Sequence, residues 1–295
     1  MICAGIEAGG TKFVCGVGNS DGKVLDRVVI PTRDPERTLG EVVNYFVGIQ
    51  KQHEIHGIGL ASFGPLDLNP ESPTYGFITS TPKQKWQYFN ITGELERALN
   101  FTIPVDTDVN AAALAEYKWG VARGKQNVVY LTVGTGIGGG GLMDGQLLHG
   151  LLHPEMGHIR IRGAGLAKDD TGVCLFHKHC LEGLASGPAM QARWGIPPED
   201  IPSDDPAWEL EAKLLAEGIA NIILILSPNI IVLGGGVMSQ KRLFPMIREH
   251  VLRLLNGYIQ HADLLENVDE YIVPPELGDN AGLLGAIALA LAQEK

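Results

Sequence analysis

Apolar and polar positions along the chain fall into short strand-like runs that alternate with longer runs of helical spacing. Short apolar runs predict strands at 2–6, 13–18, 23–30, 57–62, 102–107, 127–131, 229–233 and 270–273. Longer amphipathic or apolar runs predict helices at 36–52, 92–99, 110–120, from Leu181 onward, 206–226, 240–257 and 281–293. This alternation predicts an α/β fold whose sheets are covered by helices on both faces.

One series of predicted elements occurs twice along the chain: a strand, a Gly/Thr turn, a second strand and an Asp-Gly hairpin. The first copy has its turn at 7–12 and its hairpin at Asp21-Gly22, and the second has them at 132–136 and Asp144-Gly145. Asp-Gly between apolar runs is a strong hairpin signal. Because each copy opens one half of the chain, we expect a duplicated α/β unit. The expected domains are 1–116, with 281–295 packing back on it, and 117–280.

The two turns have the composition of phosphate-binding loops. Glycines beside a hydroxyl and an ammonium, as in Glu7-Ala-Gly-Gly-Thr11-Lys12, allow close approach to phosphate oxygens. The order Thr-Lys and the absence of a predicted helix after it exclude a P-loop. The glycine-rich run 132–141 leaves backbone amides open to a polyphosphate, and Gly234–Gly236 follows a strand where backbone passes close to a ligand. Taken singly, each turn also fits an ordinary tight turn.

Two carboxylates, Asp106 and Asp108, precede the helix predicted at 110–120. A carboxylate here is suited to accept the proton of an attacking hydroxyl in phosphoryl transfer. Asp and Asn before a helix are more often caps, and we expect Asp108 or Asn110 to cap this one. The pattern does not distinguish the two carboxylates, although Asp108 abuts the helix N-terminus, where an anion is favoured.

A His/Cys segment predicts a zinc site. It contains His153-Pro-Glu155-Met-Gly-His158 and then Cys174-x-x-His177-x-x-Cys180, with Glu182 close behind. Two thiolates, His177 and one upstream imidazole make the four ligands of a closed tetrahedral zinc site. His153 and His179 compete as ligands. Metal here would clamp the helix from Leu181 to the Glu155 loop, an architectural role outside the phosphoryl chemistry.

Charge and composition exclude several classes of protein. The 295 residues carry a formal net charge of −11, which argues against a nucleic-acid or membrane-surface partner. No apolar run reaches the length of a membrane span, and the N-terminus lacks the pattern of a signal peptide. Four cysteines are too few for a disulfide scaffold, so we expect a reducing, cytoplasmic location.

Together these residues resemble the ROK family (repressors, open reading frames and kinases), and within it the bacterial fructokinase branch. The phrases that carry the resemblance run in family order over nearly the whole chain: EAGGTK, LASFGPLDL, STPK with Trp86, DTDVNAAALAE, TVGTGIGGG, HPEMGHI, CLEGLASGP and IVLGGGVM. The resemblance implies the actin-like ATPase (ribonuclease H-like) fold, in which two α/β halves close over ATP–Mg²⁺ and a hexose.

The resemblance also implies residue roles. Asp108 becomes the catalytic base, and the sugar contacts are Gly64, Pro65, Asn110, Glu155, His158 and Glu182. The nucleotide contacts are Thr11, Lys12, Thr132, Thr135, Gly136, Pro188, Gly235 and Gly236. The ligands of a structural Zn²⁺ are His158, Cys174, His177 and Cys180, with His153 as the alternative first ligand.

Two departures from the family pattern bear on these roles. Many relatives have Asp where this chain has Glu7, and the usual motif C-x-C-G-x-x-G-C-x-E is replaced by CLFHKHCLE, as in the fructokinase branch. The expected function is an ATP-dependent hexose kinase, a fructokinase, acting as a homodimer. A glucokinase or mannokinase type is the alternative. A sugar-responsive regulator is disfavoured because the phosphate-type turn begins by residue 7, and a non-catalytic zinc or sugar-binding protein would need neither Asp108 nor ATP.

Overall fold

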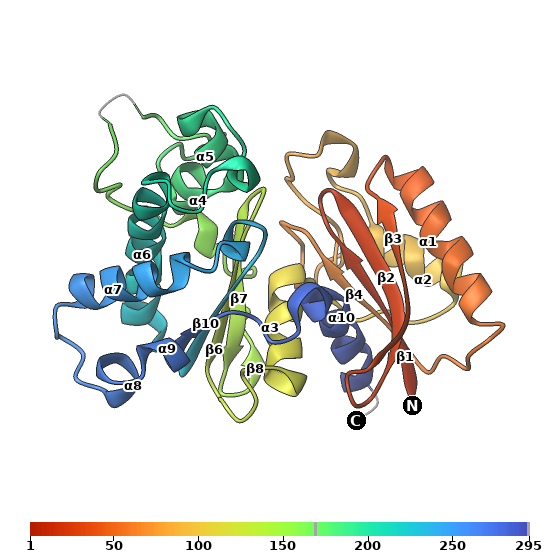
Figure 1. Cartoon of the computed structure of the whole chain (residues 1–295). Helices are drawn as coiled ribbons and strands as arrows, with labels where there is room; N and C mark the ends of the chain where they lie inside the picture. The colour runs from red at the N-terminus through yellow and green to blue at the C-terminus, as the bar shows by residue number, and fades with distance from the viewer. Residues whose placement is uncertain (168–169, 294–295) are drawn as a thin grey trace. The chain divides into compact units, whose positions relative to one another are not determined.

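The computed structural model describes residues 1–167 and 170–293, which form two compact units, each built on a five-stranded sheet (Figure 1). The first unit comprises Met1–Arg123, Leu147–Pro154 and the chain from Glu276 onward, and the second comprises Gly124–Gln146 and Glu155–Pro275. The domain boundary expected after residue 116 stays a prediction, and positions 294 and 295 of the expected C-terminal segment lie outside the described residues.

The first sheet has the strand order β3-β2-β1-β4-β5. Its strands are β1 (Ile2–Ala8), β2 (Lys12–Asn19), β3 (Val24–Pro31), β4 (Ile58–Ser62) and β5 (Val105–Thr107). The first three are antiparallel, whereas β1, β4 and β5 are parallel neighbours. The carboxyl ends of the three parallel strands therefore lie at one edge of this sheet, where α/β proteins bind ligands.

Helices cover both faces of the first sheet, as the alternation of apolar residues requires. The helices are α1 (Pro35–Ile49), α2 (Ile91–Leu99), α3 (Asp108–Trp119) and α10 (Ala281–Ala292). Ile6, Phe13 and their neighbours pack against α1 and α2, whereas Cys3 and Val14 face α10. Helices α3 and α10 approach so closely that a Cβ on Gly285 would lie 2.1 Å from the carbonyl oxygen of Ala111. The predicted α/β class is confirmed.

The second sheet has the order β10-β9-β6-β7-β8. Its strands are β6 (Val128–Val133), β7 (Ile137–Met143), β8 (Gln146–Leu147), β9 (Ile230–Gly234) and β10 (Ile272–Val273). Strands β6 and β9 are parallel, and β7 is antiparallel to β6. The helices of this unit are α4 (Leu181–Ala185), α5 (Gly187–Trp194), α6 (Ala207–Leu226), α7 (Leu243–Leu255), α8 (Ala262–Leu265) and α9 (Val268–Tyr271). They share one apolar core with β6, β9 and β10.

The helix predicted from Leu181 is interrupted after Ala185. Ser186 has an extended backbone, and its hydroxyl oxygen accepts the N–H of Ala189, so it caps a second helix that begins at Gly187. Pro188 in the first turn of that helix has no N–H to continue the first one. The second helix begins beside the turn that follows β6, where the N–H of Gly187 donates to the carbonyl of Gly134 at 2.8 Å. Pro188, the next residue, therefore also lies near this turn.

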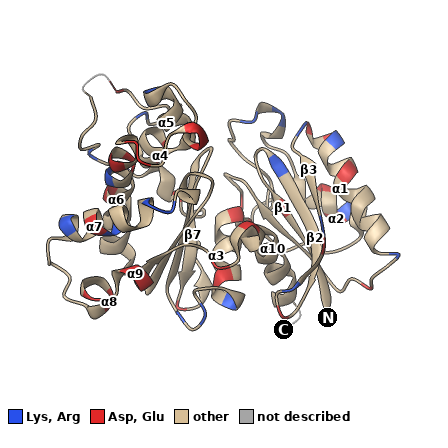
Figure 2. Ribbon diagram, in the orientation of Figure 1, with Lys and Arg blue, Asp and Glu red and all other residues tan. Residues whose placement is uncertain are grey.

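Basic and acidic positions both occur on several of the helices (Figure 2). Ion pairs one turn apart join Arg97 to Glu94 on α2, Lys213 to Glu209 on α6, and Arg253 to Glu249 on α7. Pairs of this kind contribute only about 0.3–0.5 kcal/mol each, so the apolar cores dominate stability. No helix among the described residues is long and apolar enough to cross a membrane.

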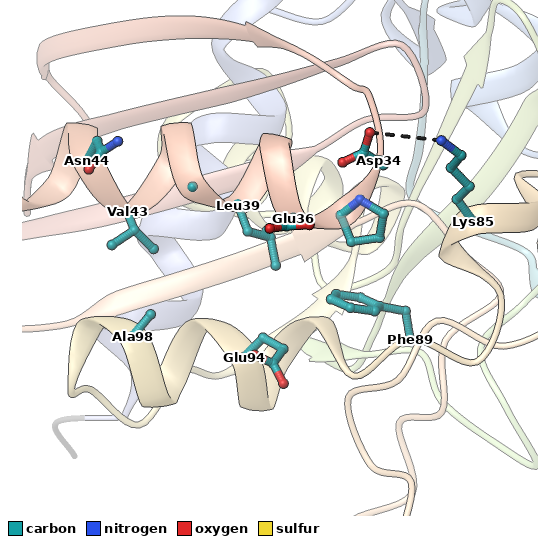
Figure 3. Close-up of a pocket in the computed structure, with 11 residues that line it drawn as sticks. Asp34, Glu36, Leu39, Val43, Asn44, Lys85, Phe89, Glu94 and Ala98 are labelled. Carbon is teal, nitrogen blue, oxygen red and sulfur yellow. Dashed lines mark ion pairs between the residues drawn. The ribbon is translucent and has the colours of Figure 1, made fainter.

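A groove of about 800 Å³ lies between α1 and α2 of the first unit (Figure 3). Leu39 and Val43 of α1 face Phe89 and Ala98 across it, and an ion pair between Asp34 and Lys85 lies at one end. Among the described residues that line this groove, none belongs to the predicted sugar or nucleotide contacts. The predicted site residues therefore lie outside this groove.

Candidate active site

The predicted catalytic and sugar-loop residues of the first unit lie at the carboxyl edge of its sheet. Ala8, Ser62 and Thr107 pair in register across β1, β4 and β5. The residues that follow them are the turn with Thr11 and Lys12, the Gly64-Pro65 loop and Asp108. The register therefore brings the glycine turn, the sugar loop and the predicted base to one edge, although they are up to about 100 positions apart in sequence.

Helix α3 is capped by Thr107, which corrects the expectation that Asp108 or Asn110 is the cap. The Thr107 hydroxyl oxygen accepts the N–H of Asn110 at 3.2 Å. Because Thr107 satisfies this helix end, Asp108 occupies the first turn without capping it. Its Oδ1 accepts the adjacent N–H of Val109 at 2.9 Å. The carboxylate thus keeps acceptor capacity for a substrate hydroxyl.

Two carboxyl groups at this edge have raised pKa values. Burial raises the pKa of Asp108 to about 6, against the opposing effect of the Val109 N–H. Burial, and then the negative charge of Asp108, raise the pKa of Glu7 to about 7. Glu7 also lies against the start of α10, where a Cβ on Gly282 would be 2.3 Å from its carboxyl carbon. A base whose pKa lies near the working pH is suited to proton transfer.

The Gly64-Pro65 loop is held by a histidine. The Nε2 atom of His153 accepts the N–H of Leu66 at 3.0 Å, and burial lowers the pKa of this imidazole. The carbonyl of Pro65 accepts the backbone N–H and the hydroxyl of Thr79 at 2.7 and 3.0 Å. These contacts fix the Gly64-Pro65 segment, and they give His153 a role in the first unit rather than among the metal ligands.

The predicted nucleotide residues of the second unit gather at the carboxyl edge of the second sheet. Thr132 of β6 pairs with Gly234 of β9, so the turn at Thr135-Gly136 and the glycines Gly235 and Gly236 leave the sheet side by side. Gly235 has φ +92°, and a Cβ there would lie 2.4 Å from the carbonyl oxygen of Val133. This crowding explains why glycine stands at this position.

Glu182, on the first turn of α4, reaches this turn. Its Oε2 accepts the N–H of Ile137 at 3.0 Å, and a Cβ on Gly136 would lie 2.7 Å from the same oxygen. The Nε2 atom of His158 lies 4.0 Å from a carboxylate oxygen of Glu182 and 4.0 Å from one of Glu155. The predicted sugar contacts Glu155, His158 and Glu182 therefore form one cluster.

The other nitrogen of His158 faces a Cys/His cluster. Its Nδ1 lies 3.3 Å from Nδ1 of His177, 3.8 Å from Sγ of Cys174 and 3.6 Å from Sγ of Cys180. The four donor atoms all lie within 4.8 Å of one another. Ligands of a tetrahedral zinc ion at the usual bond lengths would be separated by about 3.3 Å (N to N) and about 3.6 Å (N to S). The donor set and its spacing therefore fit zinc, with His158 in the first ligand position.

Sequence reasoning left the role of Asp106 open and missed His149. Asp106 is 2% exposed, and its Oδ1 accepts the side-chain amide of Asn110 at 2.9 Å. Its other oxygen, Oδ2, lies 2.8 Å from Nε2 of His149. The structure thus separates two carboxylates that the pattern could not distinguish: both oxygens of Asp106 accept hydrogen bonds in a buried position, whereas Asp108 accepts the N–H of Val109 on Oδ1. In the sequence, His149 is a single histidine in the loop after β8, and no motif marks it as functional.

Two duplicated α/β sheets, each with a glycine turn at its carboxyl edge, define the class of actin-like ATPase folds. Residues 3–293 match the family model described as ROK family. A putative fructokinase of Bacillus subtilis is 46% identical over 291 residues, 98% of this chain and 95% of that protein. A fructokinase of Pediococcus pentosaceus is 43% identical over 296 residues, 100% of this chain and 99% of that protein.

The crystal structure of a ROK family glucokinase from Streptomyces griseus in complex with glucose and AMPPNP has a TM-score of 0.79 to this chain. It is 25% identical and covers 99% of this chain and 100% of its own. The chain belongs to the ROK family, and the predicted family and fold are confirmed.

Proposed function

We propose that the chain is an ATP-dependent fructokinase that transfers the γ-phosphoryl group of ATP to O6 of D-fructose, which yields D-fructose 6-phosphate and ADP. The observation that carries the proposal is the position of Asp108, at the same sheet edge as the glycine turn and the sugar loop. The fructokinases at 43–46% identity over essentially the whole chain support fructose as the acceptor.

In this proposal Asp108 accepts the proton of the attacking hydroxyl as the oxygen bonds to phosphorus and the bond to ADP breaks. The pKa of about 6 keeps the carboxyl group ionised at neutral pH and basic enough to act. Asn110, Glu155, His158, Glu182 and the Gly64-Pro65 loop bind the sugar hydroxyls. Phosphoryl transfer depends mainly on positioning and on charge neutralisation.

We assign the nucleotide to the glycine turns. The residues that face the phosphates are Thr11, Lys12, Thr132, Thr135 and Gly136. Those that face the nucleoside are Pro188, Gly235 and Gly236. Backbone N–H groups at such turns bind phosphate oxygens without side-chain charge. Mg²⁺ would neutralise the phosphate charge. Carboxylate oxygens suit this hard cation. Glu7 fits that requirement, because its buried Oε2 has no hydrogen-bond partner among the residues that the structure describes.

Zinc in the Cys/His cluster is architectural in this proposal. Cys180 caps α4, its sulfur accepting the N–H of Gly183 at 3.3 Å, and Glu182 follows it directly. A metal bound by Cys180 and His158 would therefore fix both Glu182 and the short helix after Glu155. Zinc would contribute by holding these carboxylates in place.

A hexose panel tests the proposal. We expect ADP release coupled to fructose to exceed that with glucose, mannose or N-acetylmannosamine by at least about tenfold in kcat/KM. A strong preference for glucose or mannose would favour the glucokinase or mannokinase type. No ATP-dependent turnover with any of the four sugars would refute the kinase.

We also propose a cytoplasmic homodimer. None of the four cysteines forms a disulfide, which agrees with a reducing compartment. Large apolar side chains are exposed at the ends of α6 and α7 and in the segment after them: Leu224, Ile225, Leu254, Tyr258 and Leu265. Apolar exposure of this kind is typical of protein interfaces.

Sedimentation equilibrium is expected to give about twice the chain mass of 31.7 kDa. Ile225→Glu, which would bury a charge in the interface, is expected to shift the protein toward the monomer. A single species of 31.7 kDa for the unsubstituted protein would contradict the dimer.

A further inference from the structure

Asp106 lies two residues before the predicted base, yet none of the proposed roles uses it. Its side chain is 3% exposed. A carboxylate removed from water is costly unless hydrogen bonds or an opposite charge compensate it. Asp106 receives three donors: the N–H of Thr107 at 2.7 Å, the amide of Asn110 at 2.9 Å and the ring of His149 at 2.8 Å. Of these three, only the imidazole can supply a positive charge.

His149 compensates this carboxylate from the surface. Its side chain is 45% exposed, whereas that of Asp106 is buried. The hydrogen bond to Asp106 raises the pKa of His149, so the carboxylate favours the protonated ring. A half-exposed side chain contributes little to an apolar core. The position of this imidazole is therefore better explained by its contact with Asp106 than by packing.

The same carboxylate determines how the amide of Asn110 is oriented. The Nδ2 atom of Asn110 lies 2.9 Å from Oδ1 of Asp106 and 3.4 Å from the carbonyl oxygen of Leu148. Both neighbours are acceptors only, so the group that faces them must be the NH₂ and not the amide oxygen. Asp106 and the backbone beside His149 thus fix the plane and direction of this side chain.

The loop that carries His149 is attached to the sheet edge at both ends. Leu148 and His149 contact Asn110 and Asp106, and four residues later His153 accepts the N–H of Leu66 behind the Gly64-Pro65 loop. Residues 147–154 lie in the first compact unit, although the chain on either side of them belongs to the second. This loop therefore connects two of the proposed sugar contacts, Asn110 and Pro65.

We propose that Asp106 and His149 form a positioning pair that holds the amide of Asn110 in the orientation required to bind the sugar. This inference rests on the proposed function, in which Asn110 contacts the hexose. Neither residue of the pair needs to touch the substrate. Loss of His149 leaves the buried carboxylate without its cation, and the Asn110 amide, which shares that carboxylate, loses its fixed orientation.

The test is a double-mutant cycle on the full-length protein. We expect His149→Ala to raise the KM for fructose about tenfold, the effect of losing one hydrogen bond to a charged group, with kcat and the KM for ATP within about twofold. His149→Gln, whose neutral amide donates to Asp106, should restore only part of the affinity, because it replaces the hydrogen bond but not the positive charge. In an Asn110→Ala background, His149→Ala should change kcat/KM for fructose less than about twofold, because the residue it positions is gone.

His56→Ala is the matched control, since His56 is also exposed in the first unit and also contacts an oxygen, the carbonyl of Ile2, through one ring nitrogen. It should leave the KM for fructose unchanged. An additive effect of His149→Ala in the Asn110→Ala background would overturn the proposal, because it would mean that His149 acts on fructose binding by a route other than Asn110. An unchanged KM for fructose in His149→Ala would overturn it as well.

A readout independent of activity separates this inference from the proposed function. The side-chain amide protons of Asn110 should exchange slowly in the unsubstituted protein and faster in His149→Ala, as measured by nuclear magnetic resonance. If no hexose is phosphorylated, the proposed function fails, and exchange rates that are equal in the two proteins would still refute the pair.

Discussion

Replacing Asp108 by asparagine is expected to lower kcat for fructose phosphorylation by about 10²–10⁴-fold, the usual contribution of a general base. Asparagine has nearly the same size and keeps an oxygen that accepts the N–H of Val109, so the first turn of α3 should persist. The amide cannot accept a proton from the sugar hydroxyl. The affinity for fructose, measured by calorimetry without ATP, should therefore stay within about threefold.

Asp21→Asn provides the control, because Asp21 lies on an exposed hairpin of the same unit. It should leave kcat unchanged. Turnover of Asp108→Asn close to that of the unsubstituted enzyme would remove Asp108 from the mechanism.

The same carboxyl group predicts the pH dependence. Its folded-state pKa of about 6 lies above the ordinary aspartate value, so the base becomes protonated as the pH falls through 6. The kcat/KM for fructose should then fall about tenfold per pH unit below that midpoint. Glu7, with a pKa of about 7, titrates close by. In Glu7→Gln the acidic limb should remain if Asp108 is the base, and its disappearance would assign the limb to Glu7.

The second large effect is expected for the Cys/His cluster. Elemental analysis should give about one zinc per chain, since the four donor atoms lie within 4.8 Å of one another, close enough to bind a single ion. His177→Ala removes one ligand, and the loss of a structural metal destabilises proteins by more than about 4 kcal/mol. For a chain of this size the melting temperature should fall by about 10 °C. Chelation of the unsubstituted protein should produce a comparable shift.

His179→Ala is the matched control, two residues away, because His179 is exposed and lies outside the cluster of four donors. It should keep its zinc and its melting temperature. Loss of zinc from His179→Ala, or a purified protein that contains no zinc, would contradict the assignment.

The sequence predicted the sheet edges well because the signals there are local. Glycine turns and Asp-Gly hairpins follow from backbone conformation alone, and the parallel strands between them have continuous apolar runs. The α/β class and the family were predicted for the same reason. The Cys/His spacing similarly placed Cys174, His177 and Cys180 together, because a short loop cannot separate them far.

The cap of α3 was predicted wrongly, and the contact between Asp106 and His149 was not predicted, for a different reason. Thr107 and Asp108 are both good caps by type, and only the observed backbone decides which one accepts the N–H of Asn110. The contact between Asp106 and His149 joins residues 43 positions apart, and no periodicity connects a strand end to a later loop. The break at Ser186 was readable in principle, since Ser-Gly-Pro is a strong helix start that competes with the helix before it.

The imidazole of His158 has one ring nitrogen toward the Cys/His cluster and the other toward Glu155 and Glu182. Whatever occupies Nδ1 fixes the tautomer, so that Nε2 carries the hydrogen and can only donate. The two sides of the ring are thus thermodynamically linked, and the linkage is reciprocal. A ligand that gains affinity from the donor at Nε2 must, by the same factor, increase the equilibrium affinity of the protein for the group bound at Nδ1.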